Sequence, residues 1–276
     1  MKPLELYLHI PFCIQKCNYC DFLSAPSCAG ERKVYVESLC QKIRSYKDLA
    51  KAYHVVSIFV GGGTPSLLLS KQIEQIFEAV REIFVIDSDA EISLEANPGT
   101  VTEEKLQAYR NCGINRLSIG LQSAKDRELK RLGRIHTYEE FLWTYELARK
   151  AGFLNINVDL MSGIPLQTLA DWEETLHEVA RLKPEHISAY SLIMEEGTPF
   201  YERYGNGKHL EELPDEETER KMYYRTREIL ESYGYHRYEI SNYARLGYEC
   251  RHNLGYWNRT EYLGIGTGAA SLIREE

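Results

Sequence analysis

Residues 4–20 read LELYLHIPFCIQKCNYC, an apolar run that leads directly into three closely spaced cysteines. The run, Leu4–Ile10, is typical of a buried strand, and segments with helical periodicity separate it from similar runs further along the chain. Parallel strands need a crossover between them, so six successive strand-then-helix units predict a parallel sheet, as a doubly wound sheet or a barrel. The other five predicted strands are Val55–Val60, Glu91–Ala96, Arg116–Gly120, Asn155–Leu160 and His186–Leu192.

The segments between these runs have the pattern of helices that bury one face. In residues 71–82 the apolar positions follow the spacing i, i+3, i+4 and i+7, and residues 169–182 repeat it. Thr168 and Asp171 predict a capping box at the start of the second helix. The alternation ends after about residue 195, where a charged helix, Pro214–Tyr233, precedes a stretch rich in tyrosine and glycine.

Residues suited to chemistry gather where the predicted strands end. Barrel enzymes carry their active sites at the C-terminal ends of their strands, so these residues are expected to meet on one face. They are residues 11–20, residues 61–65, Glu95–Gly99, Gln122 and Asp159.

The composition excludes some classes of function. The 276 residues include 33 Lys and Arg against 41 Asp and Glu, and the net charge of −8 argues against general nucleic-acid binding. No stretch approaches the roughly 20 apolar residues of a membrane span, so an integral membrane protein is not expected. The start, Met1–Leu4, lacks the apolar segment of a signal peptide, which predicts a cytoplasmic protein. In that compartment, spaced cysteines indicate metal binding or catalysis before disulfides.

Cys13, Cys17 and Cys20 form a C-x3-C-x2-C pattern on the loop after the first predicted strand. A zinc ribbon normally brings a second pair of ligands at comparable spacing, and none is found. Three neighbouring thiolates suit an iron–sulfur cluster in which one iron lacks a protein ligand, with a zinc site or incidental thiols as alternatives. The other four cysteines are interpreted as small buried or surface residues: Cys28, Cys40, Cys112 and Cys250.

The segment from Tyr7 to Cys20, with its HIPFC sequence and Tyr19, resembles the opening of radical S-adenosylmethionine (SAM) proteins. Within them it is similar to the branch of oxygen-independent coproporphyrinogen III oxidase. The resemblance implies that the three cysteines hold a [4Fe–4S] cluster. It further implies that the open iron binds SAM and that electron transfer cleaves SAM to a 5′-deoxyadenosyl radical. The implied fold is α/β, a partial (β/α)6 TIM-like barrel with a short irregular C-terminal extension.

The resemblance also implies a set of SAM contacts after the other strands. Residues 61–65 read GGGTP, and successive glycines let the backbone approach a ligand closely, although a flexible turn is the alternative. An aspartate can accept from ribose hydroxyls and an arginine can hold a carboxylate, but Arg134 and Asp159 could instead pair with each other. The implied contacts are Tyr7, Tyr19, Gly62, Gly63, Thr64, Glu95, Gln122, Arg134, Asp159 and, through its backbone, Ile193.

Residues 252–257 read HNLGYW and resemble the HNxxYW signature of a haem chaperone subgroup in this branch. Imidazole is a common axial haem ligand and aromatic rings can line a porphyrin, so the resemblance implies that His252, Tyr256 and Trp257 contact haem. The alternative is a hydrogen-bonded structural histidine with core aromatics. Relatives usually carry histidine where this chain has Ala270, so no ligand is available there.

One position separates the two nearest interpretations. The oxidase carries a fourth cysteine two residues after the third cluster cysteine, and this chain has Phe22 there. We therefore expect a haem chaperone that binds the [4Fe–4S] cluster, SAM and haem and transfers haem to an acceptor protein. The alternative is the oxidase itself, which converts coproporphyrinogen III to protoporphyrinogen IX by oxidative decarboxylation.

The sequence predicts two parts of unequal size. Residues 1–235 are expected to form the partial barrel, and residues 236–276 an extension that begins a further, truncated C-terminal domain. Haem or porphyrin and an unidentified haem acceptor are the expected partners, with a homodimer as a candidate assembly and no nucleic acid.

Overall fold

The computed structural model of the chain describes residues 1–274, and its centre is a nine-stranded sheet. A small second sheet pairs β2 (Phe12–Cys13) with β3 (Ala25–Pro26) directly after the first long strand. The strands of the large sheet are β1 (Lys2–Ile10), β4 (Tyr53–Gly62), β5 (Ile86–Ala96), β6 (Arg116–Gln122), β7 (Ile156–Ser162), β8 (His186–Ser191), β9 (His236–Arg237), β10 (Asn242–Ala244) and β11 (Tyr262–Ile265).

The strand order is β11-β1-β4-β5-β6-β7-β8-β10-β9. All strands from β11 to β8 run parallel, whereas β10 is antiparallel to β8 and β9 is antiparallel to β10. The edges of the sheet are β11 and β9, so the sheet stays open. This is the predicted α/β partial barrel.

Helices connect the parallel strands, as the periodicity predicts. At the start of α7 the Oγ1 atom of Thr168 accepts a hydrogen bond from the Asp171 amide at 3.2 Å, which confirms the predicted capping box. Within residues 1–274 no helix is both long and apolar enough to cross a membrane. The helices are α1 (Ala29–Ser45), α2 (Lys47–Ala50), α3 (Ser70–Ile83), α4 (Glu103–Asn111), α5 (Asp126–Arg131), α6 (Tyr138–Lys150), α7 (Leu169–Arg181), α8 (Pro199–Tyr204), α9 (Glu216–Ser232) and α10 (Arg251–Trp257).

The six predicted strands are all present, with their ends shifted by a few residues. The largest difference is β5, which begins at Ile86 rather than at the predicted Glu91. Residues 86–90 read IDSDA and are too polar to be recognised as part of an apolar run. They are extended because β5 pairs with β4, where Val55 lies opposite Ile86.

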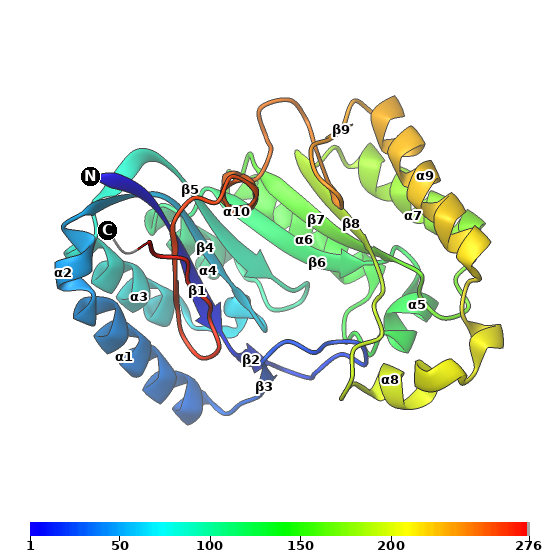
Figure 1. Ribbon diagram of the computed structural model, residues 1–276, viewed down its shortest axis with the longest axis horizontal. Coiled ribbons are helices and arrows are strands. Elements are labelled where there is room, and N and C mark those ends of the chain that lie inside the picture. The colour runs from blue at the N-terminus through cyan, green and yellow to red at the C-terminus, as the bar shows by residue number, and fades with distance from the viewer. Residues whose placement is uncertain (275–276) are drawn as a thin grey trace.

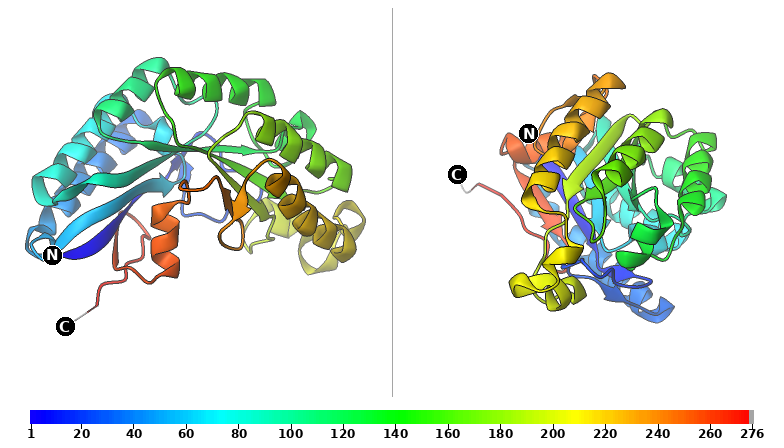
Figure 2. Two further views of the ribbon diagram at one scale, coloured as in Figure 1. Left: turned by 90° about the horizontal axis from the view of Figure 1, so that it is seen from above. Right: turned by 90° about the vertical axis from the view of Figure 1, so that its right-hand side faces the viewer.

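The sheet is an arch with helices α1 to α7 on its outer face and α10 on its inner face (Figures 1 and 2). The alternation of β1 explains these two environments, because successive strand side chains point to opposite faces. Leu4, Leu6 and Leu8 are fully buried in the core that the outer helices cover. Glu5 and Tyr7, between them, face the inside of the arch, where Glu5 meets Ser57 of β4.

The C-terminal part of the chain departs from the prediction of an irregular extension. Residues 236–265 contain β9, β10, α10 and β11, and they reach both edges of the large sheet. Strand β11 pairs with β1 while β10 pairs with β8, so this segment spans the inner face of the arch. The strands were missed because they have two to four residues each and depend on partners far away in sequence. The boundary at residue 235 stays a prediction.

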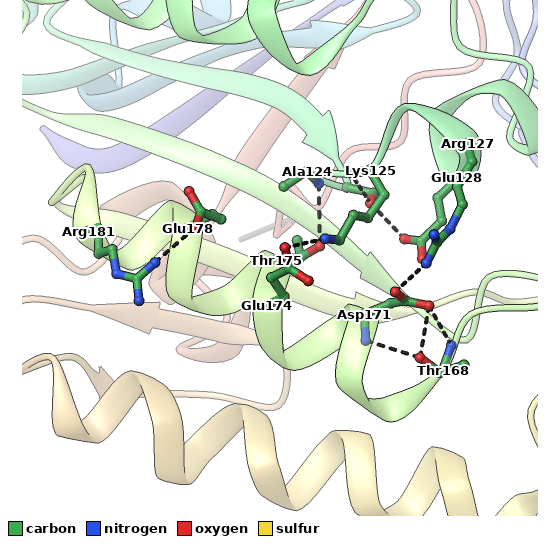
Figure 3. A network of polar contacts seen from close by, with 11 residues as sticks. Ala124, Lys125, Arg127, Glu128, Thr168, Asp171, Glu174, Thr175, Glu178 and Arg181 are labelled. Atoms are coloured by element: carbon green, nitrogen blue, oxygen red, sulfur yellow. Dashed lines mark hydrogen bonds and ion pairs between the residues drawn. The ribbon is translucent and has the colours of Figure 1, made fainter.

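A polar network ties the segment after β6 to helix α7 (Figure 3). Lys125 forms an ion pair with Glu174, and Arg127 forms one with Asp171 at the start of α7. The Ala124 amide also donates to Thr175 Oγ1 at 3.4 Å. These contacts fix the turn that follows β6. The last residue of that strand, Gln122, lies in the candidate site.

Candidate functional site

The three clustered cysteines lie on the loop that follows β1, at the C-terminal ends of the parallel strands. Their thiols are half-buried and line one cavity of about 390 Å³, which we call the cysteine cavity. Asn18, in the same loop, holds the loop in place. Its amide donates to the Leu132 carbonyl at 2.9 Å and its Nδ2 to the Arg131 carbonyl at 2.8 Å.

The arrangement of the sulfur atoms favours a cluster over a single ion. Among residues 1–274, one group of three His, Cys, Asp or Glu side chains has its ligand atoms within 4.8 Å of one another: His209, Glu211 and Glu212. Cys13, Cys17 and Cys20 do not form such a group, so at least two of their sulfur atoms lie more than 4.8 Å apart. Thiolates bound to one zinc ion, each about 2.3 Å from it, would lie within about 4 Å of one another. A [4Fe–4S] cluster is larger, so the wider spacing suits it.

The glycine-rich loop after β4 packs directly against the cysteine loop. A Cβ atom on Gly63 would lie 2.9 Å from Cys13 Sγ and 2.6 Å from the Phe12 carbonyl oxygen. Gly62 has φ +117°, and a Cβ there would lie 2.7 Å from the His9 ring. The loop therefore needs glycine for close approach and backbone conformation, which argues against an incidental flexible turn.

Two side chains place hydrogen-bond donors against the cysteine sulfurs. Thr64 Oγ1 lies 3.8 Å from Cys13 Sγ, and Arg134 Nη1 lies 3.8 Å from Cys17 Sγ. Arg134 is held by Nη2, which donates to Asn97 Oδ1 at 2.7 Å and to the Gly120 carbonyl at 2.6 Å. Arg134 therefore bonds to Asn97 and to the Gly120 carbonyl, and it forms no salt bridge with Asp159 among the described residues. Donors to sulfur tune an iron–sulfur centre.

Glu95 and Asp159 lie in the inner wall of the cysteine cavity. Burial raises the pKa of Glu95 to about 8, with the neighbouring Asp159 adding to the shift, and the Gly62 amide donates to its Oε2 at 3.0 Å. Burial also raises the pKa of Asp159, which accepts from Asn157 Nδ2 at 2.6 Å and from Ser118 Oγ at 3.2 Å. Both carboxyls are thus fixed acceptors beside the cavity.

Three further predicted residues also line the cysteine cavity. Gln122 ends β6 with φ 76°, unusual for a residue other than glycine, and accepts from the Tyr190 hydroxyl at 2.7 Å. Tyr19 lies beside Arg134, and burial raises the pKa of its hydroxyl. Ile193 follows β8 and is 67% exposed at the cavity rim.

Tyr7 lies elsewhere: it lines a second cavity of about 310 Å³, which we call the inner cavity. Its hydroxyl bonds to His9 Nδ1 at 3.0 Å. The inner cavity lies on the inner face of the arch and is bordered by the segment 241–256. The two cavities share a wall made of Glu95, Ser118, Asp159 and Tyr190.

The three predicted haem contacts differ in their exposure to solvent. His252 is 2% exposed, its Nδ1 lies 2.8 Å from Ser57 Oγ, and its Nε2 lies 3.1 Å from the Tyr256 hydroxyl. Burial lowers the pKa of His252 to about 3, so the ring is neutral. An iron bond through His252 would require one of these contacts to break. Tyr256 and Trp257, by contrast, are 40% and 55% exposed.

Asn97 lies within the predicted stretch Glu95–Gly99 but had no role assigned to it, and Ser118 and Tyr190 were not predicted. Asn97 orients Arg134 and also donates to Thr64 Oγ1 at 2.9 Å, while Ser118 and Tyr190 belong to the shared wall. Ser118 alternates with the apolar Leu117 and Ile119 on β6, and that alternation marks an inward-facing position. No local signal identified Tyr190.

Comparison with known proteins agrees with this geometry. A family model described as "Radical SAM superfamily" matches residues 7–179. Heme chaperone HemW of Escherichia coli (strain K12) is 41% identical over 275 residues, covering 99% of this chain and 71% of that protein. Heme chaperone HemW of Bacillus subtilis (strain 168) is 38% identical, covering 97% of this chain and 70% of that protein.

Among solved structures, coproporphyrinogen III oxidase (HemN) from Escherichia coli, a radical SAM enzyme, superposes with a TM-score of 0.86 at 28% identity. The match covers 99% of this chain, which spans 65% of that chain. Streptococcus suis SuiB bound to S-adenosylmethionine matches with a TM-score of 0.57 at 15% identity, which shows the fold alone. The protein therefore belongs to the radical SAM superfamily and, within it, to the HemW heme chaperone family.

Proposed function

We propose that this chain is a haem chaperone that holds a [4Fe–4S] cluster through Cys13, Cys17 and Cys20, binds SAM in the cysteine cavity and passes haem to an acceptor protein. The observation that carries the cofactor assignment is that the three thiols and the carboxyls of Glu95 and Asp159 line the same cysteine cavity. When bound, the cluster supplies one-electron chemistry to SAM.

The residues around the cavity support this assignment through their donors and acceptors. Asp159 offers carboxylate oxygens to hydroxyl donors such as those of ribose. Gly62 and Gly63 let the backbone approach the ligand, and Arg134 supplies positive charge beside Cys17. Glu95 accepts a hydrogen bond from the Gly62 amide of the glycine loop. We assign SAM contact to these residues and to Tyr19, Thr64, Gln122 and Ile193. For Tyr7, which lines the neighbouring inner cavity, SAM contact stays a prediction.

The haem assignment is supported by sequence similarity to heme chaperones and by exposed aromatic rings. Relatives at about 40% identity over nearly the whole chain are heme chaperones. Phe22 is 61% exposed at the cysteine cavity, in place of the fourth cysteine of the oxidase. Tyr256 and Trp257 present aromatic surface to solvent, where a flat porphyrin can stack.

The alternative function is that of oxygen-independent coproporphyrinogen III oxidase, which the TM-score of 0.86 to that enzyme keeps open. Both functions need the same cluster and SAM cavity. Observing those cofactors would therefore leave the choice undecided, and the product has to be measured.

The deciding experiment compares haem binding with decarboxylation. After anaerobic reconstitution of the cluster, we expect haem to bind with a defined absorbance spectrum and to move to an apo-acceptor protein. Incubation with SAM, reductant and coproporphyrinogen III should give no sustained formation of protoporphyrinogen IX. Sustained formation would overturn the carrier function in favour of the oxidase.

Cysteine variants test the ligand assignment. Cys20→Ala should abolish the broad visible absorbance of the reconstituted cluster, because it removes one of three thiolate ligands. Cys28→Ala is the matched control, since Cys28 is an exposed cysteine at the start of α1. Bleaching of the cluster by Cys28→Ala, or its survival in Cys20→Ala, would contradict the assignment.

Aromatic variants test the haem contacts. Trp257→Ala should weaken haem binding about 3- to 10-fold in an anaerobic titration, because it removes an exposed stacking surface. His252→Ala is compared with it, and only an iron-ligand role predicts a changed haem absorbance spectrum. An unchanged affinity in Trp257→Ala would rule out stacking at this position.

A further inference from the structure

The inner cavity contains a buried guanidinium that protein groups leave largely unsatisfied. Arg116, the first residue of β6, is 2% exposed and lines this cavity. The one hydrogen bond found for its side chain within residues 1–274 runs from Nη1 to Ser93 Oγ at 3.3 Å, and its buried Nε has no partner. A guanidinium carries five N–H donors, and leaving them unpaired away from water is costly.

The acidic side chains near Arg116 bond to other groups. Glu91 accepts through Oε1 from Cys250 Sγ and from the His252 amide, each at 3.3 Å. Asp159 accepts from Asn157 and Ser118, and Glu95 accepts from the Gly62 amide. Glu91 and Asp159 attract Arg116 through space, but none of the three carboxyls forms an ion pair with it among the described residues.

The other side chains that line the inner cavity differ in chemical character from one side to the other. One side is aromatic: the ring of Tyr7 stacks with Phe59 at 6.4 Å, Phe59 stacks with His252 at 5.3 Å, and His252 meets Tyr256 edge-on at 5.0 Å. The other side presents neutral polar side chains, namely Ser118, Asn157, Ser188, Ser241, Asn242 and Asn253, and the carboxyls of Glu95 and Asp159 close the cavity toward the cysteine cavity. A ligand that joins a carboxylate to a flat aromatic ring could bond to Arg116 through the carboxylate and pack its ring against the aromatic side.

We propose that the inner cavity is a carboxylate site in which Arg116 binds a propionate arm of haem. This inference rests on the proposed function, since haem carries two propionates on an aromatic ring. The volume of about 310 Å³ suits an arm or a small acid, and the porphyrin ring would lie across the opening beside Tyr256. A free small carboxylate is the second source of the same chemistry, and the experiment separates the two.

The main test changes the ligand rather than the protein. The wild-type chain is titrated anaerobically with haem and with haem dimethyl ester, in which both propionates are esterified. Loss of a charge-assisted bond should weaken binding of the diester by about 10- to 100-fold. Arg116→Gln should bind haem and the diester alike, whereas Arg227→Gln, on the exposed face of α9, should keep the difference. Far-UV circular dichroism checks that each variant is folded.

The outcomes are distinct for each claim. Equal binding of haem and diester by the wild-type chain would overturn the haem-arm assignment. In that case, propionate and succinate are tested by thermal shift: Arg116-dependent stabilisation would assign the site to a free acid, and no stabilisation would overturn the carboxylate site altogether. If neither haem nor its diester binds, the proposed function fails, and the thermal-shift result still decides whether Arg116 holds a carboxylate.

Discussion

At the scale of single residues, buried polar groups on the inner face of the arch form a chain from β1 to α10. Glu5 Oε1 accepts from Ser57 Oγ at 3.1 Å, and Ser57 lies 2.8 Å from His252 Nδ1. Glu5 Oε2 has no partner, and burial raises the pKa of Glu5 to about 8. Glu5 therefore holds a proton in the folded protein at neutral pH.

Stability should consequently depend on Glu5 and pH. Because the folded pKa of about 8 exceeds the ordinary 4.5, the contribution of Glu5 is full below pH 4.5 and lost as pH rises through 8. The free energy of unfolding should fall by on the order of 1–4 kcal/mol between pH 5 and 9, measured by urea denaturation.

Glu5→Gln should flatten this profile, although Glu95, whose pKa is also about 8, leaves part of the slope. Glu37→Gln, at an exposed position of α1, should keep the wild-type profile. A Glu5→Gln protein with the wild-type pH dependence would show that Glu5 is charged when folded.

At the scale of elements, helix α10 docks on the inner face through its glycine. A Cβ atom on Gly255 would overlap the carboxyl of Glu5, so the helix can approach β1 only because no side chain is there. Arg251 anchors the start of the helix, with Nη1 donating to the Asp89 carbonyl at 2.6 Å. This contact holds the helix that carries Tyr256 in the lining of the inner cavity.

Gly255→Ala should therefore destabilise the protein although alanine favours helices. Overpacking of this kind costs about 1–3 kcal/mol, to be measured by urea denaturation. Gly30→Ala, in α1, is the matched control because the nearest atom to its added Cβ is 3.8 Å away. That control should be neutral or stabilising by up to about 1 kcal/mol. A Gly255→Ala protein as stable as the control would mean that α10 can shift away from β1.

At the scale of the whole molecule, the C-terminal segment completes the sheet that the first 235 residues begin. Strand β11 pairs with β1 from Glu5 to Leu8, and Leu263 of β11 is 3% exposed in the main core. Core side chains of both parts therefore belong to one cluster. We expect the described chain to unfold as one cooperative unit.

Leu263→Ala should test this cooperativity. Loss of a buried leucine costs about 2–5 kcal/mol, so the urea midpoint should fall while tryptophan fluorescence and far-UV circular dichroism still report one transition. Leu246→Ala, at a position 89% exposed, should leave the midpoint unchanged. Two separate transitions would show that residues 236–274 unfold independently of the arch.

Much of the fold could be predicted from local sequence patterns, but the strands that depend on partners far away in sequence could not. The six parallel strands were predicted because apolar runs and helical periodicity are visible in short windows. Strands β10 and β11 were missed, since a three- or four-residue strand is defined by its partner: β11 pairs with β1, at the opposite end of the chain.

The same division applies to the site. Cys13, Cys17, Cys20 and the glycine loop could be found because each motif lies within a few residues, and the order of strands brings the motifs together. The pleat of β1 directs Tyr7, which was expected beside SAM, to the neighbouring inner cavity, and its contact with SAM stays a prediction. Arg116 gave no sequence signal beyond a charge at the start of an apolar strand.

By itself, the sequence determined the six long parallel strands and located the motifs to which we assign the cofactor chemistry, because periodicity, turn residues and ligand spacing are local properties. Only the tertiary structure decided that the interior of the arch holds two cavities with a shared wall, and that His252 is buried behind the Tyr256 hydroxyl. The physical reason is that burial and hydrogen bonding join β1, β4 and α10, which are far apart along the chain and meet only when the sheet curves.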